Sequence, residues 1–217
     1  MNSAQRTVLA AAIFAFAATA QSAIISFNNQ AAFLAAISAP GVDTYNDLPL
    51  ATLPHTLNRN AGPYSYTATA LPGLFFPAGT VGDVWLATNT ATDTIEFSGF
   101  SAGVRGVGGF FFATDANGLF FPGQSVTVTA SDGTTLSIPL TNTTTGTFLG
   151  FTTNVAFVFI DVVGAGSQEA PNTHWPSVNN LTLGAAPNVV PVPEPATLAM
   201  LGLGLVGLAA SRRRKVA

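Results

Sequence analysis

Cysteine is absent from the sequence, so no disulfide and no thiolate-bound metal contributes to the fold. Any folded part must therefore be held together by a hydrophobic core. Two apolar ends enclose a middle of about 165 residues, which suffices for one domain with a core of its own. We expect a single cysteine-free domain between the two apolar termini.

Positive charge is scarce in that middle segment. Between residues 21 and 190 the cations are Arg59 and Arg105, and nine acids accompany them, so two minus nine gives a formal charge of −7. An acidic surface without lysine repels phosphate backbones, which argues against nucleic acid as a partner. A cation or a neutral glycan suits such a surface better. The acids are Asp43, Asp47, Asp83, Asp93, Glu96, Asp115, Asp132, Asp161 and Glu169.

Histidine is also rare, since His55 and His174 are the two imidazoles of the chain. The segment Gly99–Gly103 fits the G-x-S-x-G pattern of a nucleophile elbow, with Ser101 at its centre. That motif requires a helix after the serine, whereas the following residues are rich in glycine and β-branched side chains. A turn between two strands is therefore predicted. Composition permits a catalytic triad without suggesting one, and we expect no enzyme activity.

Two further patterns imitate ligand-binding loops. The segment Gly202–Gly207 matches G-x-G-x-x-G, but it lies inside an apolar run with no downstream acid, so a nucleotide site is dismissed. The segment Asp115–Gly118 resembles the start of a calcium loop, yet the closing glutamate is missing. A tight turn is the favoured interpretation. We expect neither a cofactor nor a metal.

The N-terminus has the features of a signal peptide over residues 1–20. Arg6 is its lone charge, Val8–Ala18 is apolar, and Ala18-Thr19-Ala20 supplies small residues before a cut at Gln21. A cut after Ser22 or Ala23 remains open. This end predicts export through the Sec translocon and removal by signal peptidase.

The ectodomain is predicted to span residues 21–184. Short segments rich in Val, Ile, Phe and Thr are separated there by Gly, Pro, Asp and Asn, which predicts a mainly β fold, an antiparallel β-sandwich. The expected strands are Ile24–Phe27, Tyr64–Ala70, Val81–Ala87, Thr94–Phe100, Gly106–Ala113, Ser125–Ala130, Thr134–Leu140, Thr147–Phe151, Val155–Val163 and Val178–Leu183.

One short N-terminal helix of about ten residues is also predicted, capped by Asn28 or Asn29 and ended at Pro40-Gly41. Phe33, Leu34 and Ile37 are expected on its buried face.

Periodicity assigns faces to several strands. Val126 and Val128 should point inward while the intervening threonines point outward, and Asp132-Gly133 should form a tight hairpin. The segment Val155–Val163 is apolar on nearly both faces, which predicts a central strand.

Aromatic side chains are the candidates for ligand contact, because a flat ring matches the apolar face of a pyranose. Trp85 is expected in the core, although it stays a candidate glycan contact. Trp175 lies in the polar segment 172–177, where exposure and burial are equally expected. With His174 and Glu169 it forms the best candidate binding loop.

The C-terminal end has three ordered parts after a linker at residues 185–192. Pro193, Glu194 and Pro195 come first, an apolar segment at 196–210 follows, and a basic cluster ends the chain. Fifteen helical residues rise only about 22 Å, which is short for a membrane anchor unless the bilayer thins and the basic side chains snorkel. The cluster, expected to stay cytoplasmic, is Arg212, Arg213, Arg214 and Lys215.

This tail resembles the PEP-CTERM sorting signal of Gram-negative bacteria, through Pro193-Glu194-Pro195, the glycine-rich apolar segment and the terminal arginines. The resemblance implies recognition by exosortase, a membrane protease or transpeptidase, and removal of the tail. The same tail is sometimes catalogued as an ice-binding protein C-terminal domain, which does not imply ice binding. Four segments of the middle part, 27–33, 42–48, 106–112 and 178–184, resemble exported PEP-CTERM proteins. This resemblance implies a jelly-roll-like ectodomain.

These observations predict an exported protein that enters the inner membrane through a C-terminal transmembrane helix and reaches the cell surface or the exopolysaccharide (biofilm) matrix after processing. We expect it to be non-catalytic. The alternative is a carbohydrate-binding module that recognises exopolysaccharide, and a third interpretation is a secreted hydrolase that uses Ser101 or paired acids.

Overall fold

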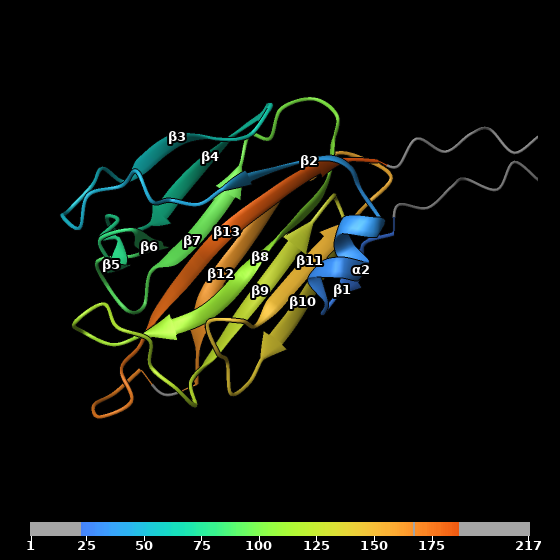
Figure 1. Ribbon diagram of the computed structural model, residues 1–217. Coiled ribbons are helices and arrows are strands. Elements are labelled where there is room, and N and C mark those ends of the chain that lie inside the picture. The colour runs from blue at the N-terminus through green and yellow to red at the C-terminus, as the bar shows by residue number, and fades with distance from the viewer. Residues whose placement is uncertain (1–22, 167, 187–217) are drawn as a thin grey trace, which may run out of the picture. The chain divides into compact units, whose positions relative to one another are not determined.

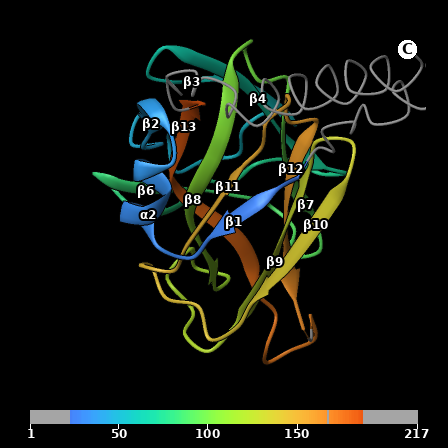
Figure 2. The same cartoon turned by 90° about the vertical axis from the view of Figure 1, so that its right-hand side faces the viewer.

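The computed structural model of the chain describes residues 23–166 and 168–186. Two antiparallel β-sheets face each other in this part, as Figures 1 and 2 show, which confirms the predicted sandwich. No helix within the described ranges is long and apolar enough to cross a membrane. The predicted signal peptide, most of the linker, and the tail with its transmembrane segment 196–210 lie outside these residues.

The larger sheet has seven strands in the order β1-β11-β8-β13-β6-β5, and β2 pairs with β13 beside this path. Its longest strands, β8 and β13, pair with each other along most of their length. The bounds are β1 Ile25–Phe27, β2 Ser38–Asp43, β5 Ala78–Thr80, β6 Asp83–Ala87, β8 Val104–Thr114, β11 Phe148–Thr152 and β13 Trp175–Ala185.

The second sheet has six strands in the order β10-β9-β12-β7-β4-β3. β12 is internal, which confirms the predicted central strand. It begins at Phe159, later than predicted, so Phe157 is buried ahead of the strand and Val158 is 55% exposed. The bounds are β3 Thr56–Ala61, β4 Tyr64–Leu71, β7 Thr94–Ser98, β9 Ser125–Ser131, β10 Thr135–Leu140 and β12 Phe159–Ala165.

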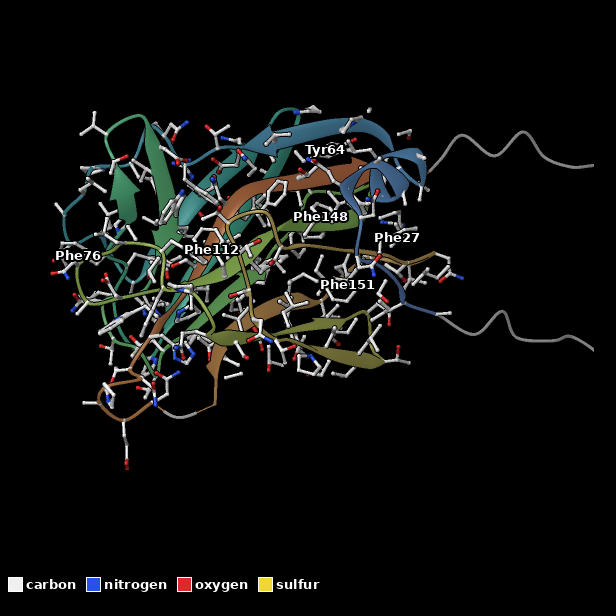
Figure 3. All side chains as sticks on the ribbon, turned by 60° about the horizontal axis from the view of Figure 1, so that its bottom comes forward. Phe27, Tyr64, Phe76, Phe112, Phe148 and Phe151 are labelled. Carbon is white, nitrogen blue, oxygen red and sulfur yellow. The ribbon has the colours of Figure 1, made fainter. Side chains whose placement is uncertain are left out.

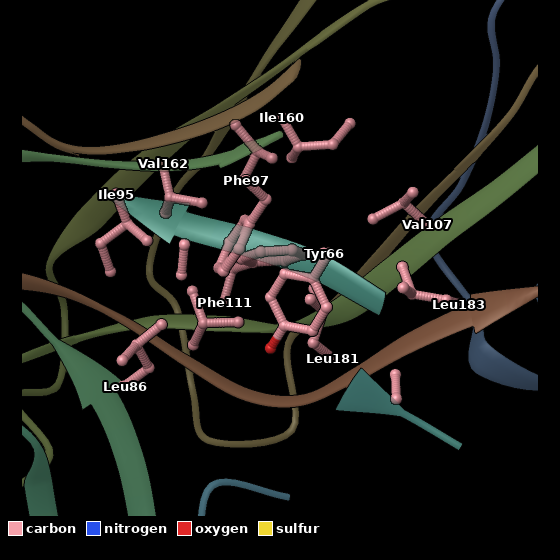
Figure 4. Close-up of a cluster of buried hydrophobic side chains, with 14 of the residues drawn as sticks. Tyr66, Leu86, Ile95, Phe97, Val107, Phe111, Ile160, Val162, Leu181 and Leu183 are labelled. Atoms are coloured by element: carbon pink, nitrogen blue, oxygen red, sulfur yellow. The ribbon is translucent and has the colours of Figure 1, made fainter. Parts of the chain in front are cut away.

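The main core lies between the two sheets, where alternate side chains of each strand point inward (Figure 4). Val126 and Val128 are fully buried, as their alternation with threonine predicts. The core side chains labelled in the figure include Ile95, Phe97, Ile160 and Val162 from the six-stranded sheet and Val107, Phe111, Leu181 and Leu183 from the seven-stranded sheet.

Helix α2 (Gln30–Ala35) covers the outer face of the larger sheet beside β1 and β11 (Figure 2). Asn29 caps it, as predicted, because its Oδ1 accepts a hydrogen bond of 3.0 Å from the Ala32 amide. The helix has six residues, fewer than expected, since Pro40-Gly41 belongs to strand β2 and does not end a longer helix. Leu34 is 37% exposed, whereas Phe33 and Ile37 are buried.

Glycine makes room for this helix. A Cβ at Gly150 would lie 2.5 Å from Phe33, and one at Gly106 would lie 2.3 Å from Ile37. Gly184 also lies directly under Ile37. The glycines of the larger sheet therefore form a seat into which the two apolar side chains of the helical segment pack.

Strands β2, β3 and β5 were not predicted from the sequence. β2 contains Pro40 and Gly41, and β5 contains only three residues. β3 is an edge strand with a polar sequence, TLNRNA, that alternates exposed and partly buried positions. Proline is tolerated in β2 because that strand pairs with β13 beside the main path of the sheet.

Candidate functional site

Two adjoining surface hollows share one wall at an end of the sandwich. Asp115, Ala116, Asn117 and Trp175 line both hollows. The first hollow has a volume of about 440 Å³ and the second about 320 Å³, within the usual range for ligand sites. The first is completed by Phe76, Ala78, Ala87, Thr88, Asn89, Thr114 and Gly118, and the second by Phe121, Ala170, Pro171 and Thr173.

The shared wall exists because strands β8 and β13 are paired at this end. Trp175, the first residue of β13, is the register partner of Thr114, the last residue of β8. The hydroxyls of Thr114 and Ser177 lie 2.9 Å apart and add a side-chain contact between the same strands. Trp175 is thereby held beside the turn that follows β8.

That turn, Asp115–Gly118, is the tight turn predicted from the sequence. The Asp115 Oδ1 accepts hydrogen bonds from the amides of Asn117 at 2.8 Å and Leu119 at 2.9 Å. Gly118 has a φ of +72°, which favours glycine, and its carbonyl accepts a hydrogen bond of 2.8 Å from Gly79 in β5. The wall is therefore fixed to its own strand and to β5.

His174 organises the wall of the second hollow from inside the protein. Its side chain is fully buried, with Nδ1 at 2.8 Å from the Asn172 carbonyl and Nε2 at 3.0 Å from the Ser125 carbonyl. Gln168 accepts from the His174 amide, and Thr173 donates to the Gln168 carbonyl. His174 therefore has no exposed face for a sugar and instead positions residues 170–173.

The two tryptophans have different environments. Trp85 is 8% exposed, its ring meets Phe112 edge-on at 4.9 Å, and its Nε1 donates to Asp83 at 3.1 Å. Trp175 is partly buried and faces both hollows. Of the three candidate glycan contacts, Trp175 alone is placed at the surface depressions, while Trp85 and His174 lie in the interior.

Several residues that line the hollows were not predicted from the sequence. Phe76 is 42% exposed, and Figure 3 shows it at the opposite end of the sandwich from Phe27. Asn89 and Asn117 are exposed, and Phe121 is partly exposed. The run Leu74–Phe76 offered a weak signal, because adjacent residues of an extended segment point to opposite sides and one large apolar side chain must face outward.

A charged cluster lies elsewhere, on β2, β3 and the segment after β2. Arg59 contacts Asp43 at 2.6 Å and Asp47 at 2.7 Å, and its guanidinium lies 5.5 Å from the Tyr45 ring centre. The hydrogen bond from Arg59 lowers the pKa of Asp47, and burial raises the pKa of Tyr66 well above its usual value. Arg59 therefore pairs with two carboxylates, of which Asp43 is buried and Asp47 is exposed.

Ser101 and the two histidines each have hydrogen-bond contacts of their own. Ser101 lies in the predicted strand-to-strand turn, and its Oγ accepts a hydrogen bond of 3.2 Å from the Ser65 amide. The Nδ1 of His55 instead contacts the Gly73 carbonyl at 2.9 Å, and His174 is engaged as described above. Neither imidazole is placed to activate Ser101.

A pair of acids lies on the outer face of the six-stranded sheet. Asp161 and Glu96 are register partners on β12 and β7, and both are partly buried. Burial, followed by the charge of Glu96, raises the pKa of Asp161 to about 6. Within residues 23–166 and 168–186 no group of three His, Cys, Asp or Glu side chains is placed to hold a metal ion.

The described part is thus an antiparallel β-sandwich with a tryptophan-lined surface depression. The profile of the PEP-CTERM protein-sorting motif matches residues 191–215, which include Pro193, Glu194, Pro195 and the three arginines. The chain therefore carries the PEP-CTERM motif, as predicted, and this motif marks a protein that is exported, anchored through its C-terminus and processed by exosortase. Searches of curated proteins and of solved structures found no match.

Proposed function

We propose that this chain is a non-catalytic protein of the cell surface or exopolysaccharide matrix, with a jelly-roll-like ectodomain delivered by exosortase. The observation that carries the proposal is the sorting motif at residues 191–215. In the proposed route, the Sec translocon exports the chain and signal peptidase removes residues 1–20. The segment 196–210 then holds the chain in the inner membrane, with the arginine cluster in the cytoplasm.

The non-catalytic role is supported by the bonding of the candidate groups. Ser101 accepts a backbone hydrogen bond in a turn, and the two imidazoles contact carbonyl oxygens elsewhere. A nucleophile of this type needs a base within hydrogen-bond reach. Turnover of an ester or glycoside that is lost in Ser101→Ala would contradict the non-catalytic role.

Fractionation of matched strains tests the delivery route. In a strain with exosortase we expect the ectodomain in the surface and medium fractions. In the same strain without exosortase we expect it in the inner-membrane fraction, because the tail is no longer removed. Equal distribution in the two strains would contradict sorting by exosortase.

A second candidate function is carbohydrate binding, and the half-buried Trp175 between two hollows favours it. Trp85→Phe provides a matched control, because Trp85 is buried against Phe112 and lines neither hollow. Binding to a glycan array that is lost in Trp175→Ala and kept in Trp85→Phe would support this function. Array binding that Trp175→Ala leaves unchanged would contradict it.

A further inference from the structure

We propose that the two hollows hold consecutive sugar units from the interior of an uncharged polysaccharide chain, with the chain passing over Trp175. This inference rests on the carbohydrate-binding function proposed above and adds the class of ligand and the mode of binding. Its starting point is the shared wall, since Asp115, Asn117 and Trp175 line both hollows.

The arrangement favours an extended ligand. The first hollow is lined by Ala78 of β5 and Ala87 of β6, and the second is lined by Pro171 of the loop before β13. A ligand confined to one hollow would leave the other face of the wall unused. In a polysaccharide chain that continues through both hollows, two successive sugar units each contact Trp175.

Each hollow offers an apolar surface for a sugar ring. Phe76 in the first hollow and Phe121 in the second complement Trp175, which both hollows share. A pyranose has one face of C–H groups that packs on such rings, and its hydroxyls need polar partners. The exposed amides of Asn89 and Asn117 supply donors and acceptors beside these rings.

The negative charge in the lining of the hollows disfavours binding of acidic polysaccharides. Among the residues that the structure describes, Asp115 is the one charged residue in the lining of either hollow. Arg59 and Arg105 line neither hollow, and Arg59 already binds Asp43 and Asp47. A uronate carboxylate placed here would lie near Asp115 without a cation to compensate it. An uncharged polysaccharide meets no such penalty.

The walls are organised in advance of binding. The Asp115–Gly118 turn is hydrogen-bonded to Gly79, and residues 168–174 are held by the buried His174. A preorganised site loses little conformational entropy on binding, so contacts with a second sugar unit translate into affinity.

Isothermal titration calorimetry on the full chain, purified in detergent, tests the inference. The probes are neutral gluco-, manno- and xylo-oligosaccharides of one to six units and oligogalacturonates of the same lengths. For a neutral series that binds, we expect affinity to rise at least about tenfold from the monosaccharide to the trisaccharide. Oligogalacturonates should bind at least about tenfold more weakly than neutral oligomers of equal length.

Substitutions in each hollow test separately whether that hollow holds a sugar unit. Trp175→Ala should reduce trisaccharide affinity at least about tenfold, because its ring contacts both units. Phe76→Ala alters the first hollow alone and Phe121→Ala the second alone, so each should bring trisaccharide affinity toward that of the monosaccharide. Val158→Ala, at an exposed position that lines neither hollow, is the control, and the melting temperature of each variant checks its fold.

The outcomes separate this inference from the function on which it rests. Neutral binding with no dependence on chain length would overturn the two-unit mode while leaving carbohydrate binding intact. Oligogalacturonates that bind as tightly as neutral oligomers would overturn the selection by charge. Binding by none of the probes would overturn both this inference and the carbohydrate-binding function.

Discussion

Arg59 and Asp43 form an ion pair that joins the two sheets. Asp43 ends β2 of the seven-stranded sheet, and Arg59 lies in β3 of the six-stranded sheet. The Arg59 Nε donates to Oδ2 of Asp43 at 2.9 Å and Nη2 donates to Oδ1 at 2.6 Å, a two-pronged geometry. Tyr66 donates to the same carboxylate at 2.7 Å, so the buried charge of Asp43 is well compensated.

Removal of this guanidinium should destabilise the ectodomain. Arg59→Met leaves the 4%-exposed carboxylate of Asp43 without its cation, and we expect the free energy of unfolding to fall by about 3 kcal/mol. Asp47→Asn is the matched control, because Asp47 is 68% exposed and its pair with Arg59 should contribute less than about 1 kcal/mol. Urea denaturation measures both, and equal losses would contradict the dominance of the Asp43 contact.

The glycine seat beneath α2 gives a second prediction. Gly150→Ala should lower the free energy of unfolding by about 2 kcal/mol, since its Cβ would lie 2.5 Å from the buried Phe33 ring. Gly146→Ala is the control, because the nearest atom to its Cβ would be Thr144 Oγ1 at 3.7 Å. Thermal denaturation distinguishes the two, and a Gly150→Ala variant as stable as Gly146→Ala would contradict the close packing of the helix.

The raised pKa of Asp161 predicts that the stability of the folded protein depends on pH. Its ordinary pKa of 3.8 is raised to about 6 in the folded protein, so the folded state binds this proton more tightly than the unfolded state. The stabilisation that protonated Asp161 gives to the folded state is therefore fully present below about pH 4. It is lost as the pH rises through about 6.

The substitution Asp161→Asn removes this titration. We expect it to raise the free energy of unfolding at pH 7 by about 1 kcal/mol, a value reduced for the partial exposure of the group, and to have a smaller effect at pH 4. Urea denaturation at the two pH values is the measurement. A larger stabilisation at pH 4 than at pH 7 would contradict the assignment.

Limited proteolysis tests the extent of the folded unit. β13 runs to Ala185, and the Ser38 hydroxyl donates to the Ala186 carbonyl at 2.6 Å, so the backbone is held to two residues beyond the predicted end at 184. We expect the first cut in residues 187–192, followed by slow digestion. A first cut within 125–140 would contradict the integration of the β9–β10 hairpin into the sheet.

Local signals account for what the sequence predicted correctly. The Asn29 cap, the alternation at Val126 and Val128, and the turn at Asp115–Gly118 each depend on neighbours within a few residues. The sorting motif at 191–215 is likewise contiguous. Such features can be recognised without knowledge of the tertiary structure.

The features that were not predicted depend on residues that are distant in the sequence. β2 forms because Ser38 and Asp43 lie opposite Ala185 and Leu181, which is a pairing that its own Pro and Gly do not suggest. The buried ring of His174 contacts the carbonyl of Ser125, a residue far away in the sequence. Trp175 faces the hollows because it pairs with Thr114. No pattern within the segment 172–177 contains this information.

The C-terminus of the mature protein offers the most direct test of sorting by exosortase. Pro193 and Pro195 each fix φ and lack a backbone donor, so Glu194 should be held in an extended segment at the membrane surface, accessible to a membrane-embedded enzyme. Replacement of all three residues by alanine is the matched control, because it should leave a full-length, membrane-retained chain.

The decisive measurement is mass spectrometry of the C-terminal peptide from the surface fraction of a strain that has exosortase. We predict a peptide that ends near Pro193-Glu194-Pro195 and lacks Arg212, Arg213 and Arg214. An intact peptide that ends at Ala217 in this fraction would contradict it and would show that the tail is a plain membrane anchor.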